Sequence, residues 1–226
     1  MTSLDELLKA SATHHSHLCP RQVLGVRMAL LAGELLNLDV PRKDKRLLAL
    51  VETDGCAADG IAAGSGCYVG RRTMRVIDYG KVAATFVDTE TEQAVRVVPH
   101  ASARERSRAY AADEPVRWKA QLRGYQTMPA EELLVASAVT LALSLRKLIS
   151  KDGCRVLCQM CSEEIINERE VHVGGLVLCR ACAGDAYYQA SHADNRQAIA
   201  IPMEMIFSEK CAEYALVRDL VRAAAA

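Results

Sequence analysis

Two Cys-x2-Cys pairs constrain this chain more than any other feature of its sequence. Seventeen residues separate the pairs, and residues 170–178 between them read as a β-hairpin with its turn at Gly174-Gly175. Two such pairs on facing turns give the closed tetrahedral thiolate site typical of structural zinc. We therefore predict a zinc ribbon in which metal binding supplies folding free energy, with four free thiols as the alternative. The predicted ligands are Cys158, Cys161, Cys179 and Cys182.

Charge and cysteine content narrow the class of protein. Lys and Arg total 28, as do Asp and Glu, and this balance disfavours a nucleic-acid-binding role. The segment Met1–Ala12 lacks the apolar core of a signal peptide, and the apolar run Val135–Leu145 is too short to cross a bilayer. Nine cysteines in such a chain favour metal binding over disulfides. We expect a cytoplasmic protein without a membrane segment.

Hydrophobic periodicity predicts alternating helices and strands before a boundary at residues 150–153. The tail, residues 186–226, reads as largely helical, with Cys211 in a structural role. The two strands of residues 74–79 and 82–88 are expected to pair as a hairpin at Tyr79-Gly80-Lys81. The expected helices are residues 2–12, 20–38, 56–66, 101–124 (broken at Pro115) and 129–148, and the expected strands are residues 46–52, 74–79, 82–88 and 94–98.

A second group of potential ligands lies near the amino terminus. His17 and Cys19 are two residues apart, so they point the same way in an extended segment, and Cys19 precedes a helix beginning at Pro20. Cys56 and Cys67 lie in glycine-bounded loops that follow a predicted strand. These features are typical of a metal site or a reactive thiol. A helix cap beside small buried cysteines is the alternative.

Several motifs in order resemble the FmdE family, which takes its name from a small component of formylmethanofuran dehydrogenase. The matching segments are His15-x-His17-x-Cys19-Pro20, Gly25-x-Arg27-Met28-Ala29, Cys56-Ala-Ala-Asp59, Gly66-Cys67 and Asp78-Tyr-Gly-Lys81. The resemblance implies an α+β core, a mixed β-sheet flanked by helices (FwdE/GAPDH-like), followed by the ribbon and helical tail. The implied domains are residues 1–150, 151–185 and 186–226. Family members tend to form homodimers.

The resemblance also implies a metal site in the core domain, separate from the ribbon zinc. By position, its ligands are His17, Cys19 and Cys56, with His15 and Cys67 as further candidates. Such ligands suit a second transition metal, either zinc, iron or nickel. The sequence departs from the usual pattern at residues 68–73, where Arg71 and Arg72 could bind an anion such as a pterin phosphate or simply form a solvated face.

Three functions follow from these expectations. The first is a metal-binding accessory protein that serves molybdenum or tungsten enzymes, by handling a metal, a pterin cofactor or the partner enzyme. The second is a metal-dependent enzyme that uses the open His/Cys site to polarise a carbonyl or activate water. The third is a zinc-ribbon regulatory or interaction protein, whose acidic ribbon suits contact with protein better than with nucleic acid.

Overall fold

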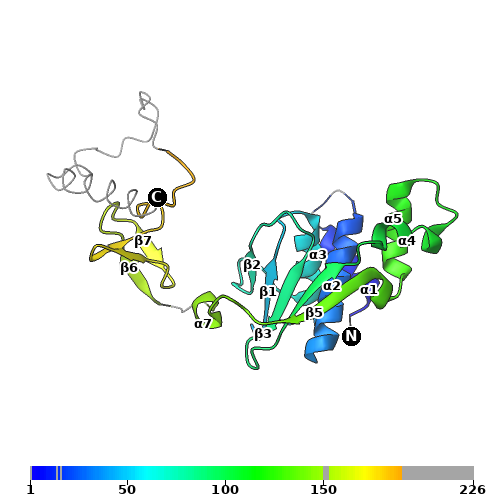
Figure 1. Ribbon diagram of the computed structural model, residues 1–226, viewed down its shortest axis with the longest axis horizontal. Coiled ribbons are helices and arrows are strands. Elements are labelled where there is room, and N and C mark those ends of the chain that lie inside the picture. Colours follow the sequence, from blue (N-terminus) through cyan, green and yellow to red (C-terminus); the bar gives the residue numbers. More distant parts are fainter. Residues whose placement is uncertain (1, 14, 16, 150–152, 190–226) are drawn as a thin grey trace. The chain divides into compact units, whose positions relative to one another are not determined.

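A five-stranded mixed β-sheet forms the centre of the first of two units, Met1–Ile149. The computed structural model describes residues 2–13, 15, 17–149 and 153–189. The strand order is β2-β1-β3-β4-β5; β2 is parallel to β1, and the other neighbouring pairs are antiparallel. The strands, shown in Figure 1, are β1 (Leu47–Val51), β2 (Met74–Val76), β3 (Ala84–Asp88), β4 (Ala94–Pro99) and β5 (Leu134–Val139).

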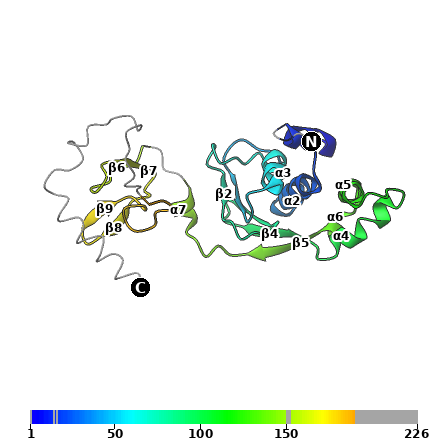
Figure 2. The same ribbon diagram turned by 90° about the horizontal axis from the view of Figure 1, so that it is seen from above.

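The helices gather mainly on one face of this sheet, where the principal core forms (Figure 2). Successive side chains of a strand point to opposite faces, so Leu47, Ala49 and Val51 of β1 pack against the helices, whereas Leu48 and Leu50 join a smaller cluster on the other face. The α+β expectation is thus confirmed. The helices are α1 (Leu4–Ala12), α2 (Pro20–Leu36), α3 (Cys56–Ser65), α4 (Ala103–Arg106), the 3₁₀ helix η1 (Ala109–Ala111), α5 (Arg117–Thr127), α6 (Ala130–Leu133) and α7 (Leu145–Leu148).

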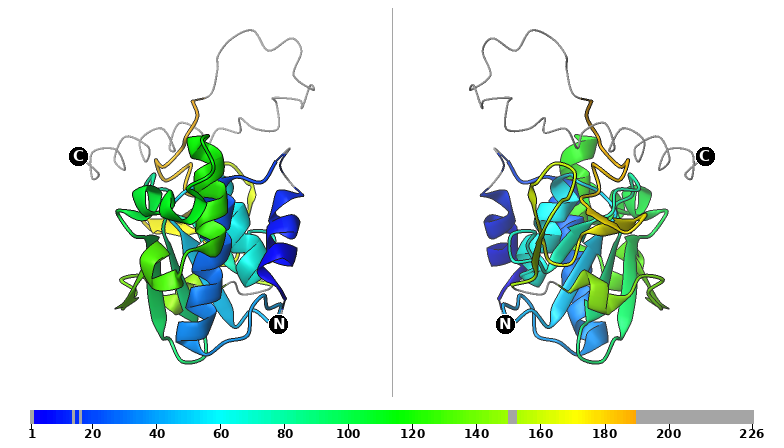
Figure 3. Two further views of the ribbon diagram at one scale, coloured as in Figure 1. Left: turned by 90° about the vertical axis from the view of Figure 1, so that its right-hand side faces the viewer. Right: turned by 90° about the vertical axis from the view of Figure 1, so that its left-hand side faces the viewer.

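Glycines allow α2 and α3 to pack with their backbones in contact. A Cβ atom at Gly25 of α2 would lie closer than 3.0 Å to the Ala57 oxygen of α3, and one at Gly60 would meet the Gln22 oxygen equally closely. Residues near the start of α2 therefore meet residues near the start of α3, and the two helices run side by side in the same direction. The helix α1 packs against both of them (Figure 3).

The hairpin predicted at Tyr79-Gly80-Lys81 is wrong. Strand β1 lies between β2 and β3 and pairs with both, so the two predicted partners never meet. The turn itself is present, with Gly80 at φ 65°, but the backbone N–H groups of Tyr79 and Lys81 both donate to the carbonyl of Glu52 just beyond β1. The turn thus carries the chain across the end of β1 instead of folding it back on β2.

The long helix predicted over residues 129–148 is also wrong. The segment forms one turn of helix, α6, then the strand β5, and then the short α7. Strand β5 completes the sheet by pairing with β4 from Pro99↔Leu134 to Ala94↔Val139. Hydrogen bonding to the open edge of β4 and the β-branched Val135 and Val139 outweigh the helical spacing of leucines, because tertiary pairing overrides a weak local propensity.

The second unit, Ser150–Ala226, contains two small β-hairpins within its described part. One hairpin joins β6 (Arg155–Leu157) to β7 (Glu164–Ile166), and the other joins β8 (Val171–Val173) to β9 (Leu176–Leu178). The second is the hairpin expected in the ribbon, and its Gly174 and Gly175 both have positive φ. Most of the predicted helical tail, residues 190–226 with Cys211, lies outside the described residues. Among the helices that are described, none has the length and apolar character needed to cross a membrane.

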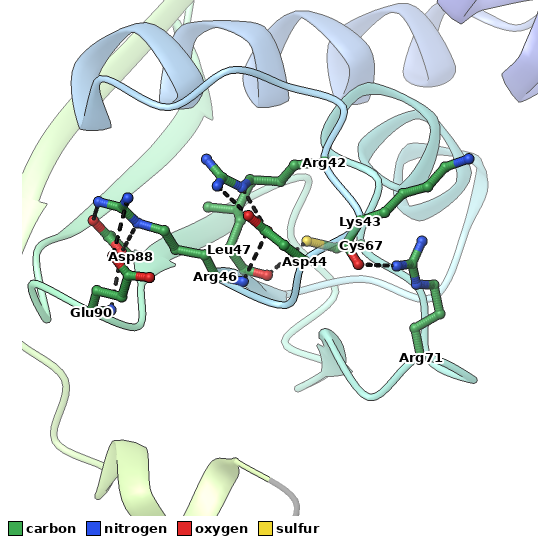
Figure 4. Close-up of polar contacts among 9 residues, drawn as sticks. All are labelled: Arg42, Lys43, Asp44, Arg46, Leu47, Cys67, Arg71, Asp88 and Glu90. Atoms are coloured by element: carbon green, nitrogen blue, oxygen red, sulfur yellow. Dashed lines mark hydrogen bonds and ion pairs between the residues drawn. The ribbon is translucent and has the colours of Figure 1, made fainter.

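A buried carboxylate ties the start of β1 to the end of β3. Asp88 is 1% exposed and accepts two hydrogen bonds from Arg46, at 2.9 and 2.8 Å (Figure 4). It also accepts hydrogen bonds from the Glu90 N–H and the Thr91 hydroxyl. The Arg46 guanidinium, aided by these donors against the effect of burial, holds the pKa of Asp88 well below its usual range.

We expect Gly25→Ala to lower the free energy of unfolding by about 2–3 kcal/mol, because the added methyl group must push α2 and α3 apart. Urea denaturation followed by circular dichroism measures this change. Gly70→Ala is the matched control, since nothing lies within 4 Å of the added atom, and should change stability by less than about 0.5 kcal/mol. Equal effects of the two changes would contradict the packing described.

Asp88→Asn should destabilise the protein by about 3 kcal/mol at pH 7, since it leaves the partly buried Arg46 with only the exposed Glu90 as a counter-charge. The folded-state pKa of Asp88 lies below its unfolded-state pKa of about 3.9. The charged carboxylate therefore contributes its full stabilisation above about pH 3.9, and this contribution is lost as the pH falls from there toward the folded-state pKa. The stability gap between parent and variant should therefore narrow in urea titrations from pH 7 to pH 3. A gap that stays constant over this range would show that the ion pair is not its source.

Candidate functional site

Two thiols from distant parts of the chain meet at the start of α2 and α3. Cys19 is the N-cap residue of α2, and Cys56 is the first residue of α3. The glycine-mediated packing of the two helices brings these residues together, and the two thiols interact. Both line a cleft of about 540 Å³. Cys19 is 8% exposed, so only a small part of it is open to solvent.

Gln22, one turn into α2, fixes the position of Cys19. Its side-chain oxygen accepts a hydrogen bond from the Cys19 N–H at 2.8 Å, and its Nε2 donates to the Ser11 carbonyl at 2.8 Å and to the Ser11 hydroxyl at 3.1 Å. Gln22 has no exposed surface, so each of these bonds is made away from water. A buried, fully bonded side chain has few alternative positions, and it therefore anchors the cysteine against α1.

Burial keeps Cys19 protonated. It raises the pKa of the thiol, the neighbouring Cys56 adds to the effect, and the N–H groups of Gln22 and Arg21 only partly oppose it. A thiol in this state is a weak nucleophile. A metal ion would displace its proton, because thiolate rather than thiol is the ligand. The raised pKa of Cys19 therefore argues against an activated nucleophile and is compatible with a metal ligand.

Most of the rest of the cleft comes from residues 99–125, which run from the end of β4 into α5. Its walls combine apolar side chains with polar ones, and no carboxylate belongs to the described lining. Trp118 and Tyr125 of α5 contribute aromatic rings. The lining residues are Cys19, Pro20, Arg21, Leu24, Cys56, Val82, Pro99, His100, Ala101, Ala103, Arg104, Trp118, Gln121 and Tyr125.

The two amino-terminal histidines have other neighbours. The Nε2 of His15 lies 2.6 Å from a carboxylate oxygen of Asp59 in the first turn of α3. His17 meets Trp118 edge to face, with ring centroids 5.7 Å apart. His17 thus stands beside an aromatic wall of the cleft. Within the part of the chain that the structure describes, it does not share a common point with Cys19 and Cys56 close enough for one ion.

Cys67 lies apart from this pair. It follows α3, whereas Cys56 begins it, so the length of a ten-residue helix, about 15 Å, separates them. The Cys67 thiol is buried and donates to the Leu47 carbonyl at 3.2 Å (Figure 4). Nearby, the Arg71 guanidinium donates to the carbonyl of Lys43. These contacts hold the loop after α3 against the start of β1.

Sequence reasoning missed the far wall of the cleft. Arg104 and Gln121 lie in a charged stretch that reads as a helix, His100 directly precedes it, and no regular spacing distinguishes the side chains that line the cleft. One signal was available: His100 directly follows β4, and ligand sites often form where strands end. Because these residues lie about 80 to 100 positions from Cys19, only the folded structure reveals their proximity.

The four ribbon cysteines form a compact group. Their sulfur atoms lie within 4.8 Å of one another, and among the described residues no other set of three or more His, Cys, Asp or Glu ligands does so. Backbone N–H groups point at the sulfurs, as from Cys179 to Cys158 at 3.2 Å and from Cys182 to Cys179 at 3.4 Å. Burial opposes ionisation of Cys158, but the N–H donors outweigh it and lower its pKa to about 7. The group can therefore hold one metal ion in a closed thiolate site.

Comparisons with known proteins give three similarities. A curated relative, a probable S-adenosyl-L-methionine-binding protein of Archaeoglobus fulgidus, is 34% identical over 103 residues, which are 44% of this chain and 28% of the relative. The chain thus spans little more than a quarter of that relative's length.

A solved structure shares the fold. It is a tungsten formylmethanofuran dehydrogenase FmdE-like protein from Syntrophus aciditrophicus, and the match covers 83% of this chain and 96% of that one, with a TM-score of 0.55 and 23% identity. The family model described as FmdE, molybdenum formylmethanofuran dehydrogenase operon, matches residues 14–135, which include Cys19, Cys56 and most of the cleft. This chain therefore belongs to the FmdE family, as its motifs predict.

Proposed function

We propose that this protein is a metal-binding accessory protein that serves molybdenum or tungsten enzymes or the handling of their cofactor. The observation that carries the proposal is the pair Cys19 and Cys56, set side by side in a cleft of an FmdE-family chain. An accessory protein must bind its cargo reversibly. A partly open site with few protein ligands suits that task, because positions remain for a cargo or a partner's donor group.

In this proposal, Cys19 and Cys56 hold a second metal, either zinc, iron or nickel. Two thiols at one point fit a soft or borderline transition metal. His17 supplies a third donor by turning its ring away from Trp118, a movement open to a side chain that is already exposed. Gln22 orients Cys19 through the backbone, in the way that outer groups commonly position metal ligands.

The ribbon has a different role in the proposal. Four thiolates saturate zinc, so the ion stabilises the small unit and takes no part in chemistry. The described core of the ribbon is only Cys158, Ile165 and Leu178, with a few partly buried neighbours, and metal binding would supply the folding free energy that so small a core lacks. Glu163, Glu164 and their acidic neighbours make the ribbon a surface for protein contact rather than for nucleic acid.

Partner binding is the remaining part of the proposal. We assign homodimer formation, and contact with a molybdenum or tungsten enzyme or its pterin cofactor, to this chain. Strand β5 supports a protein contact, because it ends the sheet with β4 as its neighbour and carries the half-exposed Val135. Such an edge presents unpaired backbone groups that another chain can satisfy.

Metal analysis tests both proposed sites. We expect about two metal ions per chain in the parent protein. The Cys19→Ser/Cys56→Ser double variant should keep about one ion, bound by the ribbon. The Cys158→Ser/Cys161→Ser variant should lose the ribbon ion. Elemental mass spectrometry of the purified proteins measures the content, and circular dichroism checks the fold. Cys67→Ala is the matched control, since its thiol is hydrogen-bonded elsewhere, and should keep both metals. One ion in the parent and in the core double variant alike would refute the core site.

The accessory role is tested in cells that depend on a molybdenum or tungsten enzyme. We expect loss of this protein to lower the metal or pterin content and the activity of that enzyme, with restoration by the parent chain and by Cys67→Ala. The Cys19→Ser/Cys56→Ser variant should fail to restore them, because the cargo site is gone. Full restoration by the double variant would exclude the cleft from this role.

A further inference from the structure

The cleft has a second feature that the two thiols do not explain, namely an excess of positive charge. Arg21 stands next to Pro20 at the start of α2, and Arg104 lies in α4; both line the cleft and both are exposed. Among the described residues, neither forms an ion pair with a carboxylate. Some other arginines of the unit do have such partners, as Arg96 has in Glu52. Two uncompensated guanidinium groups around one hollow favour an anion within it.

Arg104 is held at the wall by an aromatic neighbour. Burial raises the pKa of the Tyr125 phenol, and the adjacent Arg104 guanidinium opposes that shift, so the two groups are in close contact. Tyr125 itself is 4% exposed and packs in the principal core. Arg104 thus lines the cleft beside a buried neighbour.

His100 adds a donor of fixed direction. The N–H of Ser102 donates to its Nδ1 at 3.2 Å, and the Ser102 hydroxyl lies 2.9 Å from the same atom. An Nδ1 that accepts a hydrogen bond leaves the proton of the neutral ring on Nε2. That N–H has no acceptor among the described residues, although the ring lines the cleft. Arg21, Arg104 and His100 thus all offer donors, and the lining has no carboxylate to receive them.

Much of the remaining wall of the cleft is apolar. Trp118 is 41% exposed and faces a cleft that Leu24, Val82 and Pro99 also line. Large half-exposed rings in a concave site offer a flat surface on which a planar group can rest. The cleft therefore combines positively charged donors with aromatic and aliphatic side chains, beside two thiols.

We propose that the cleft binds a small organic anion, a carboxylate or a phosphate ester on a planar apolar body, with the anionic group on Arg21, Arg104 and His100 and the body against Trp118. This inference deepens the proposed function. It rests on that function only in that both place the functional site in this cleft. The volume of about 540 Å³ lies within the range of ordinary small-molecule sites.

Trp118 makes the test direct, because it is the only tryptophan of the chain and it lines the cleft. Its fluorescence is followed, on excitation at a wavelength selective for tryptophan, while the full-length protein is titrated with benzoate, phenyl phosphate and the neutral benzamide. We expect saturable changes with the two anions and none with benzamide at equal concentration. Whether phenyl phosphate or benzoate binds more tightly tells which headgroup the cleft prefers.

Charge variants test the named residues. Arg21→Gln and Arg104→Gln should each raise the Kd of the anions at least about tenfold, since each removes a charge-assisted contact. Arg108→Gln is the matched control, because Arg108 is exposed on the same helical stretch but does not line the cleft, and it should leave the Kd unchanged. Circular dichroism checks that each variant is folded.

Equal responses to benzoate and benzamide, no saturable response to either anion, or unchanged affinity in both arginine variants would overturn the inference. Its failure is separable from that of the proposed function, because the Cys19→Ser/Cys56→Ser variant should still bind the anions through the arginines. Anion binding with no core metal would leave this inference standing and refute the metal site. Binding of a core metal without any preference for anions would refute this inference and leave the metal site standing.

Discussion

Backbone contact between α2 and α3 determines where the chemistry of this protein can lie. Gly25 and Gly60 leave no room for a side chain between the helices, so the two helix starts come to the same place. Cys19 and Cys56, 37 residues apart in the chain, become neighbours as a result. The same packing places α2 on the sheet. Residues of α4 and α5 then form further walls of the cleft beside the start of α2. The cleft is therefore a consequence of helix packing rather than of a flexible loop.

The parts of the fold that local chemistry dictates could be predicted from sequence. The Cys-x2-Cys spacing and Gly174-Gly175 define the ribbon hairpin within a few residues, and Pro20 with its apolar periodicity defines α2. The sharing of one site by Cys19 and Cys56 followed from family resemblance instead. Nothing in the local sequence indicates that the first residues of α2 and α3 lie next to each other, because their proximity depends on a glycine contact between distant segments.

The errors arose where distant pairing decides the structure. Residues 134–139 have leucines and alanines at helical spacing on either side, yet they form β5 because β4 has a free edge to satisfy. Strands β2 and β3 flank Gly80 and are adjacent in sequence, which predicts that they pair with each other. In the structure, β1 lies between them and pairs with both. The spacing of His17 and Cys19 likewise gives no sign that the His17 ring meets Trp118, about 100 positions further along the chain. In each case the competing partner is remote in the chain and carries no local signal.

The two thiol groups differ in a way that divides their roles. In the ribbon, four sulfurs converge with N–H donors aimed at them, so a bound ion is enclosed and has no position for a further ligand. In the cleft, two thiols line the same open space as an aromatic ring and two arginines that have no carboxylate partner among the described residues. This contrast is the reason that we assign a structural zinc ion to the ribbon and the binding of a cargo to the cleft.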